Sequence, residues 1–172
     1  MKRLLTVLLI LCLFMRGGAL ADAAPLTEAD FELAYAGGVY ALGTDPAPLL
    51  AAMEKRDGEK PEVFEAESCL FQGTDKEITG QELILATYPM GPGGRDLLET
   101  VVIYGGPWVT CRGIGVGSAK DEVISAYGEQ YRMDYDQMVY AVGEPYESPM
   151  VIFQLDLETS LVTAVFLMAH SA

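Results

Sequence analysis

The side chains that could carry out chemistry in this chain are cysteines, a single histidine and many carboxylates. His170 is the only histidine and the third residue from the C-terminal end, where chains commonly fray. A Ser-His-Asp or Cys-His site needs an imidazole as its base. We therefore expect no nucleophilic catalysis of this kind, and the sequence predicts neither a catalytic residue nor a cofactor.

Paired carboxylates remain, because Asp and Glu together number 25. Glu65 and Glu67 alternate along an expected strand, as do Asp134 and Asp136, so each pair shares a face. A glycosidase uses such a pair across a cleft, with one carboxyl group buried enough to keep its proton. A solvated strand face is the simpler interpretation, because acidic side chains are rarely buried. An extracellular carboxylate-dependent hydrolase acting on a glycan or peptide is therefore the alternative function.

Neither a metal site nor a phosphate site is predicted. Two cysteines without a nearby histidine do not complete a zinc shell, and Asp134-Tyr-Asp136 lacks the spacing of an EF-hand. The Gly-rich stretch at 113–118 precedes an expected helix but lacks the Gly-Lys-Ser/Thr ending of a phosphate-binding loop. Asp121 and Glu122 would add negative charge to the first turn of that helix, so we expect a tight strand-to-helix corner instead.

Cys69 and Cys111 allow one intramolecular disulfide. It would close a loop of about 40 residues, worth roughly 3–4 kcal/mol if the unfolded chain loses the corresponding entropy. The alternative is two separate thiols that pack as small hydrophobic groups. The sequence leaves both open, since a disulfide needs the two Cα atoms within ~7 Å of each other.

The first residues have the pattern of an export signal. Lys2 and Arg3 precede a 12-residue run at 4–15 that is apolar except for Thr6, and Ala-Leu-Ala at 19–21 fits a cleavage site. The run is too short for a membrane span, which needs ~20 apolar residues. We predict a signal peptide at 1–21 and a secreted or cell-envelope-associated protein, without stable membrane insertion after cleavage. An assembly factor held on the membrane by an uncleaved leader is a third hypothesis.

The chain is strongly acidic. It has 11 Lys and Arg against 25 Asp and Glu, a net charge of −14 and a sequence pI of about 4.3. Loss of the leader would remove three of these 11 basic residues and no acidic residue. We expect no nucleic-acid binding, because a nucleic-acid-binding protein needs a basic face. The charge favours solubility or a partner with a basic surface.

Two stretches of sequence, at 38–50 and 113–124, are similar and lie about 75 residues apart. Each predicts a short helix: in the first Thr44 or Asp45 caps it, and in the second Ser118 caps it, Asp121 follows at N3 and Gly128 ends it. Three extended segments are expected after each helix, at 63–71, 82–88 and 97–104 and at 132–142, 150–156 and 161–168. A hairpin at 31–35 and 39–42 is expected to lead into the first half, and 108–112 into the second.

The predicted fold class is α+β. It consists of two tandem repeats, each a short helix packed on a three- to four-stranded antiparallel sheet, because the links have hairpin length and no helix separates the strands within a half. The predicted domains are the signal peptide at 1–21, a first repeat at 22–106 and a second at 107–172. Each half alone would have a thin core, so we expect the halves to share an interface or join their sheets.

This arrangement resembles the β-lactamase-inhibitory-protein fold and the related small outer-membrane assembly lipoproteins. The chain looks most similar to uncharacterised exported proteins of Gram-positive gut bacteria, through Ser-Cys-x-x-x-Gly at 68–73, Thr-Tyr-Pro at 87–89 and Gly-Ile-x-Val-Gly-Ser at 113–118. The likeness covers most of 31–169. It implies an exported, inhibitor-like scaffold, and it assigns no functional residue.

Aromatic residues give the most plausible binding surface. The candidates gather in and just before the second half: Trp108, Tyr131, Tyr135, Tyr140 and Tyr146. Tyr and Trp are enriched at protein interfaces, although tyrosines also pack well in the core of a sheet. The sequence thus predicts a secreted, non-enzymatic protein-interaction module, whose partner is an unknown protein or a component of the cell wall.

Overall fold

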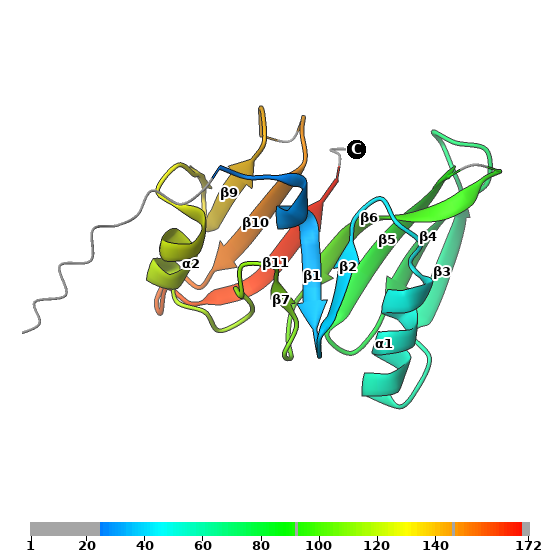
Figure 1. Ribbon diagram of the computed structural model, residues 1–172, viewed down its shortest axis with the longest axis horizontal. Coiled ribbons are helices and arrows are strands. Elements are labelled where there is room, and N and C mark those ends of the chain that lie inside the picture. Colours follow the sequence, from blue (N-terminus) through cyan, green and yellow to red (C-terminus); the bar gives the residue numbers. More distant parts are fainter. Residues whose placement is uncertain (1–24, 92, 146, 170–172) are drawn as a thin grey trace, which may run out of the picture.

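The computed structural model describes residues 25–91, 93–145 and 147–169, which form two α-helices, a short 3-10 helix (Glu28–Phe31) and two antiparallel sheets (Figure 1). The predicted leader at 1–21 lies outside the described residues. So do Tyr146 and His170.

Within the described residues, the larger sheet has eight strands in the order β3-β4-β5-β6-β11-β10-β9-β8. Along the chain, helix α1 (Ala47–Asp57) precedes strands β3–β6 of this sheet, and helix α2 (Lys120–Tyr127) precedes strands β8–β11. The pairing of β6 with β11 joins the two sets into one sheet. The strands are β3 (Glu62–Glu67), β4 (Thr74–Thr79), β5 (Leu83–Gly91), β6 (Arg95–Ile103), β8 (Arg132–Asp134), β9 (Gln137–Ala141), β10 (Met150–Leu155) and β11 (Val162–Met168).

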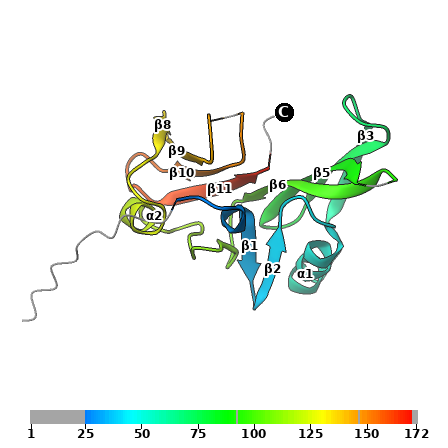
Figure 2. The same cartoon turned by 45° about the horizontal axis from the view of Figure 1, so that its top comes forward.

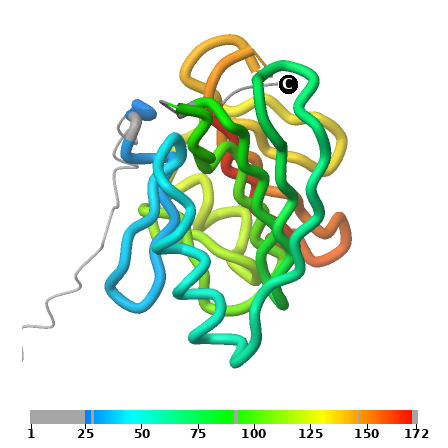
Figure 3. Tube along the Cα trace, turned by 90° about the vertical axis from the view of Figure 1, so that its right-hand side faces the viewer, coloured from blue at the N-terminus to red at the C-terminus, as the bar shows by residue number. Residues whose placement is uncertain are grey.

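Both helices lie on the same face of the larger sheet (Figure 2). Figure 3 shows α1 and the neighbouring hairpin on one side of β3–β6. Leu49 and Met53 of α1, and Val123 and Tyr127 of α2, are buried in the main core. The sheet contributes alternate residues of its strands, which point to one face: Leu83, Leu85, Val101, Ile103, Val151, Phe153, Val165 and Leu167.

A smaller sheet packs on the same side, with the order β2-β1-β7. Strands β1 (Glu32–Tyr35) and β2 (Gly38–Ala41) form the predicted hairpin, whose turn residues Ala36 and Gly37 both have positive φ, 49° and 81°. Strand β7 (Val109–Thr110) forms in the predicted segment 108–112 and pairs with β1. The smaller sheet therefore takes strands from both sides of the predicted boundary between 106 and 107.

Helix α1 has Pro46 as its N-cap, directly after the predicted cap residues Thr44 and Asp45. Asp45 accepts a hydrogen bond from the Ala47 backbone N–H at 2.9 Å, so its carboxylate satisfies one free donor of the first turn. Gly58 ends the helix with φ of 75°, and its N–H donates to the Glu54 carbonyl. A left-handed residue at this position favours glycine because it has no Cβ.

The start of α2 differs from the prediction by one residue. Ala119 is the N-cap, and Glu122 at N3 accepts a hydrogen bond from the Ala119 N–H at 2.8 Å. The Ser118 hydroxyl instead accepts from the Gly115 N–H, so it stabilises the preceding turn rather than the helix. Gly128 ends the helix as predicted, with its N–H bonded to the Ile124 carbonyl.

The prediction of an α+β protein with antiparallel sheets is confirmed. The division into two equal repeats is not clear in the structure, since the halves share one continuous sheet and the smaller sheet mixes strands from both. Two strand predictions were wrong in detail. The segment 74–79 was not predicted and forms β4, and the segment 132–142 is a hairpin of β8 and β9 rather than one strand.

Candidate interaction surface

The face of the larger sheet opposite α1 and α2 is called the open face below, because within the described residues no helix packs on it. The strand register places its side chains in rows. One row contains Phe64, Glu77, Ala86, Thr100, Met168, Met150 and Ala141. The next row contains Glu62, Thr79, Ile84, Val102, Phe166, Ile152, Val139 and Arg132. Apolar side chains fill the centre of both rows, and charged ones lie toward the edge strands.

The two halves of the open face differ in exposure. On β9 and β10, Val139, Met150 and Ile152 form a second apolar cluster and are at most 5% exposed. On the edge strand β3, Phe64 is 69% exposed. Transfer of such a side chain out of water is worth about 1.5–3 kcal/mol, so the β3 end of this face has apolar area that a partner could cover.

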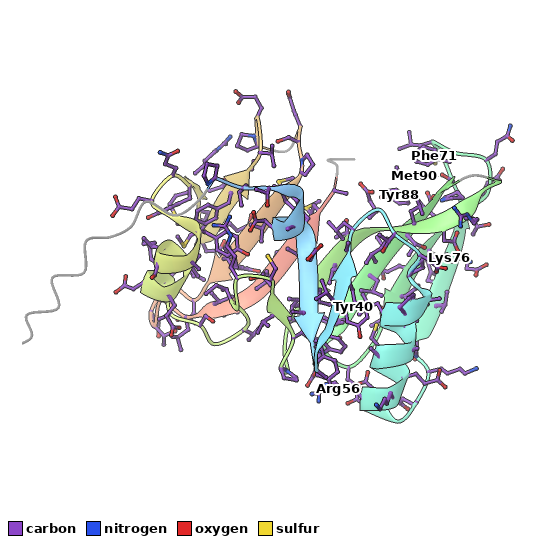
Figure 4. All side chains as sticks on the ribbon, in the orientation of Figure 1. Tyr40, Arg56, Phe71, Lys76, Tyr88 and Met90 are labelled. Carbon is purple, nitrogen blue, oxygen red and sulfur yellow. The ribbon has the colours of Figure 1, made fainter. Side chains whose placement is uncertain are left out.

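Phe71, Tyr88 and Met90 gather at the end of β5, on the edge of the open face; they are called the aromatic corner (Figure 4). The ring of Phe71, from the loop between β3 and β4, lies 6.2 Å from the ring of Tyr88, and the planes are tilted by 31°. Phe71 is 38% exposed, while Tyr88 and Met90 are half-buried. This spacing is typical of an attractive aromatic pair.

The aromatic corner is bordered by acidic groups. Burial raises the pKa of Tyr88, and the nearby carboxylates of Glu99 and Asp75 raise it further. Glu99 is only 4% exposed. Oxygen Oδ1 of Asp75 is buried and has no hydrogen-bond partner among the described residues. Two carboxylates therefore act on the ring of Tyr88 at this corner.

A groove of about 730 Å³ lies on the other face, between the start of α1 and the ends of β3–β6. Lys76 lines it and pairs with two carboxylates: its Nζ is 2.8 Å from Asp96 Oδ2 and 3.7 Å from Glu65 Oε1. The hydrogen bond that Lys76 donates to Asp96 is the main cause of the raised pKa of Lys76. The two carboxylates, 56% exposed in Glu65 and 27% in Asp96, lack the burial by which a general acid holds its proton at neutral pH.

The aromatic residues predicted as a surface do not lie together. Trp108 is 1% exposed; its ring lies 4.1 Å from that of Tyr35, and its Nε1 donates to Glu82 Oε2 at 3.2 Å. Burial of a large ring whose N–H has a partner is favourable. Trp108 is therefore a core residue, and it does not contribute to an exposed surface.

Tyr140 is also a core residue. It is 1% exposed, its ring contacts those of Tyr127, Tyr131 and Phe153, and its hydroxyl donates to the Gly128 carbonyl at 2.8 Å. The prediction that Trp108 and Tyr140 belong to one exposed surface is corrected by this burial.

Tyr131 and Tyr135 differ from each other as well. Tyr131 is half-buried on the helix side, where its ring contacts Tyr140 and lies 5.8 Å from the Lys120 ammonium. Tyr135 is 83% exposed, with a positive φ of 55°, in the turn between β8 and β9. Of the four described candidates, Tyr135 alone is freely accessible.

Cys69 and Cys111 are separate thiols in the structure, both exposed. Cys69 lies in the loop between β3 and β4, whereas Cys111 follows β7 with its sulfur 3.7 Å from Asp30 Oδ1. Partial burial and the Asp30 carboxylate raise the pKa of Cys111 to about 11. This sulfur is therefore a protonated, weakly nucleophilic thiol at neutral pH.

Sequence reasoning missed the residues of the open face, including Phe64, Phe71 and Tyr88. A signal was present: β5, β10 and β11 are apolar at almost every position, not at every second one. A strand with one solvated face alternates between apolar and polar residues. Continuous apolar strands indicate that the second face is also used.

Two further searches bear on the site. Across residues 25–91, 93–145 and 147–169, no group of three or more His, Cys, Asp or Glu side chains could hold a metal ion. None of the helices in that part of the chain is long and apolar enough to cross a membrane. Comparison with family models, with curated proteins and with solved structures finds no match to this chain.

Proposed function

We propose that the chain is a secreted, non-enzymatic protein-interaction module that binds a partner protein, or a protein of the cell wall, through the open face of its larger sheet. One observation carries the proposal: both helices and the smaller sheet pack on one face, while the β3–β6 part of the other face presents the exposed Phe64 beside half-buried apolar side chains of β5 and β6. Contiguous exposed apolar surface marks interaction sites in soluble proteins.

The distribution of charge supports this proposal. The two rows of the open face carry Glu62 and Glu77 at the β3–β4 end and Arg132 at the far end, with uncharged residues between them. An apolar centre with a polar rim is the usual anatomy of a protein interface. The exposed Phe64 and Phe71 add the aromatic anchors that such interfaces favour.

We also propose that α1 with β3–β6 and α2 with β8–β11 are corresponding units of a tandem repeat, as in the inhibitor-like fold that the sequence resembles. Support comes from the element order, since each helix precedes four antiparallel strands. Export through the predicted leader at 1–21 belongs to the same proposal, because loss of that leader removes Cys12 and leaves an acidic chain with two thiols, which suits an extracellular setting.

The alternative, a carboxylate-dependent hydrolase, receives less support. The groove beside α1 brings Glu65 and Asp96 within reach of one Lys76 ammonium, and both carboxylates are partly solvated. A glycosidase needs one carboxyl group in an environment that raises its pKa. The lysine here supplies a counter-ion in place of the required apolar surroundings.

The proposed function is tested by capture from the envelope fraction of the producing organism, with the immobilised full-length protein as bait. A variant with Phe64→Ser and Phe71→Ser removes exposed apolar area from the open face. Leu157→Ser is the matched control, since Leu157 is 63% exposed in the turn between β10 and β11. We expect one saturable partner, captured by the wild type and the control and lost from the double variant. Absence of any saturable partner, or equal capture by all three proteins, would contradict the proposal.

A further inference from the structure

The aromatic corner has the composition of a site for a positively charged side chain. Phe71 and Tyr88 present two ring surfaces 6.2 Å apart, one of which is 38% exposed, and Met90 lies beside them (Figure 4). Aromatic faces attract ammonium and guanidinium groups, and the attraction is stronger where water is partly excluded. The apolar ring and thioether surfaces also suit the methylene stem of a lysine or arginine.

The carboxylates at this corner come from two neighbouring elements. Asp75 belongs to β4 and pairs in register with Ala66 of β3, on the strand face opposite Lys76. Glu99 lies in β6, where the register with β5 shifts between Ala86 and Thr87, and its charge acts on Tyr88. A buried carboxylate oxygen without a donor, such as Asp75 Oδ1, is destabilising until a donor approaches it.

The two rows of the open face contain no basic residue on strands β3 to β6. Lys76 is on the other face of β4, where Glu65 and Asp96 already pair with it. At the end of the sheet that holds the corner, Arg95 begins β6 opposite Gly91 and, like Lys76, lines the groove beside α1. The described part of the corner is therefore acidic and aromatic, and these two cations lie on the groove side. That combination distinguishes the corner from a general acidic surface, which would have no ordered apolar rings.

Resting on the proposed function, we propose that the aromatic corner binds a lysine or arginine side chain of the partner protein. The methylene stem packs on Phe71, Tyr88 and Met90, and the cationic head donates hydrogen bonds to the Asp75 carboxylate. Glu99 adds to the negative potential from the β6 side. The partner surface that covers the open face thus carries at least one basic residue, placed over the end of β5.

The experiment uses two short probes, Ac-Gly-Arg-Gly-NH2 and its neutral match Ac-Gly-Gln-Gly-NH2, titrated into the full-length protein with isotope-labelled aromatic rings and Met methyl groups. We expect the arginine probe to shift the NMR signals of Phe71, Tyr88 and Met90 to saturation, and the glutamine probe to leave them in place. Asp75→Asn should weaken arginine binding about tenfold, the loss expected for one charge-assisted hydrogen bond. Glu65→Gln is the matched control, because it removes one charge from the same end of the sheet but from the helix-covered face.

Three outcomes would overturn the inference: shifts spread over acidic residues on both faces without saturation, equal weakening by Asp75→Asn and Glu65→Gln, or dimer formation that buries the corner without the probe. Failure here is separable from failure of the proposed function. If the partner is captured by the wild type and by Asp75→Asn alike, and is lost only with the Phe64 and Phe71 double variant, the open face binds its partner without a cation at this corner. If no partner is captured, the proposed function fails whatever the probe does.

Discussion

The ion pair between Asp30 and Arg112 offers the sharpest test of how the N-terminal segment is held to the second half. Asp30 is 3% exposed and accepts hydrogen bonds from Arg112 Nε and, at 2.9 Å, from Nη2. Arg112 also donates to the Ala126 carbonyl at 2.9 Å and lies 4.8 Å from the centre of the Tyr127 ring. One side chain thus ties the 3-10 helix before β1 to the end of α2.

Asp30→Asn removes the negative charge and leaves the arginine without its counter-ion. Breaking a buried pair by removing one partner costs about 3–5 kcal/mol. Arg112 is 17% exposed and keeps its bond to Ala126, so we expect the lower end of this range, about 3 kcal/mol of unfolding free energy. For a domain of this size that corresponds to roughly 6–12 °C in Tm. Urea denaturation and calorimetry at pH 7 measure both quantities.

Acid should erase the difference between the wild type and Asp30→Asn. Burial alone would raise the pKa of Asp30, but hydrogen bonds from Arg112 and Thr27 outweigh it and hold the pKa below its ordinary value of 3.8. A depressed pKa in the folded state gives stability that is full above the unfolded pKa and is lost as pH falls through the folded pKa. The gap between the two proteins should therefore be constant near pH 7 and shrink below about pH 4.

The control for this prediction is Arg56→Gln, which breaks the more exposed ion pair with Glu82 and leaves the Glu82 carboxylate as the acceptor for Trp108. That pair has side-chain exposures of 28% and 22% and should contribute only about 0–1 kcal/mol. A loss under 1 kcal/mol in Asp30→Asn, or a loss equal to that of Arg56→Gln, would refute the conclusion that Asp30 and Arg112 form a buried ion pair that stabilises the fold. So would a gap that persists unchanged at pH 2.

Three further predictions concern single side chains. Because the pKa of Cys111 is raised to about 11, iodoacetamide at pH 8 should alkylate it slowly. In the chain without residues 1–21, which hold Cys12, Cys69→Ser should leave only this slow reaction in a mass-spectrometric time course; a fast reaction in that variant contradicts the raised pKa. Phe64→Ser should change the unfolding free energy by less than about 0.5 kcal/mol, since the ring is 69% exposed; a larger loss in urea denaturation would show that the ring is part of the core. Tyr140→Phe should cost about 1 kcal/mol because the Gly128 carbonyl loses its buried donor, and an unchanged denaturation midpoint would show that this bond contributes nothing.

Much of the fold could be predicted because its signals are local. Asp45, which bonds the first turn of α1, and Gly128, which ends α2, lie at helix ends whose backbone conformations and caps are decided by neighbouring residues. The hairpin of β1 and β2 follows from the turn at Gly37. These features need no knowledge of distant contacts.

The parts that could not be predicted depend on long-range pairing or on polar strands. Strand β4 has the sequence Thr-Asp-Lys-Glu-Ile-Thr, in which only Ile78 is buried, so no apolar pattern marks it as a strand. Its strand state comes from hydrogen bonds to both β3 and β5. The candidate surface failed for a similar reason: Trp108 and Tyr140 have the residue types of an interface, but their burial is decided by Tyr35, Tyr127 and Phe153, which lie far away in sequence.

The pairing of β6 with β11 explains why neither helix lies on the open face of the larger sheet. Neighbouring antiparallel strands are related by a local twofold axis perpendicular to the sheet, and such an axis does not exchange the two faces. Each helix precedes four strands that end at this joint, so both helices remain on the same side. A parallel joint would need a crossover connection and would permit covering elements on either face. The open face is thus a consequence of how the two sets of strands are joined. Its apolar side chains are the feature through which we propose that it binds a partner.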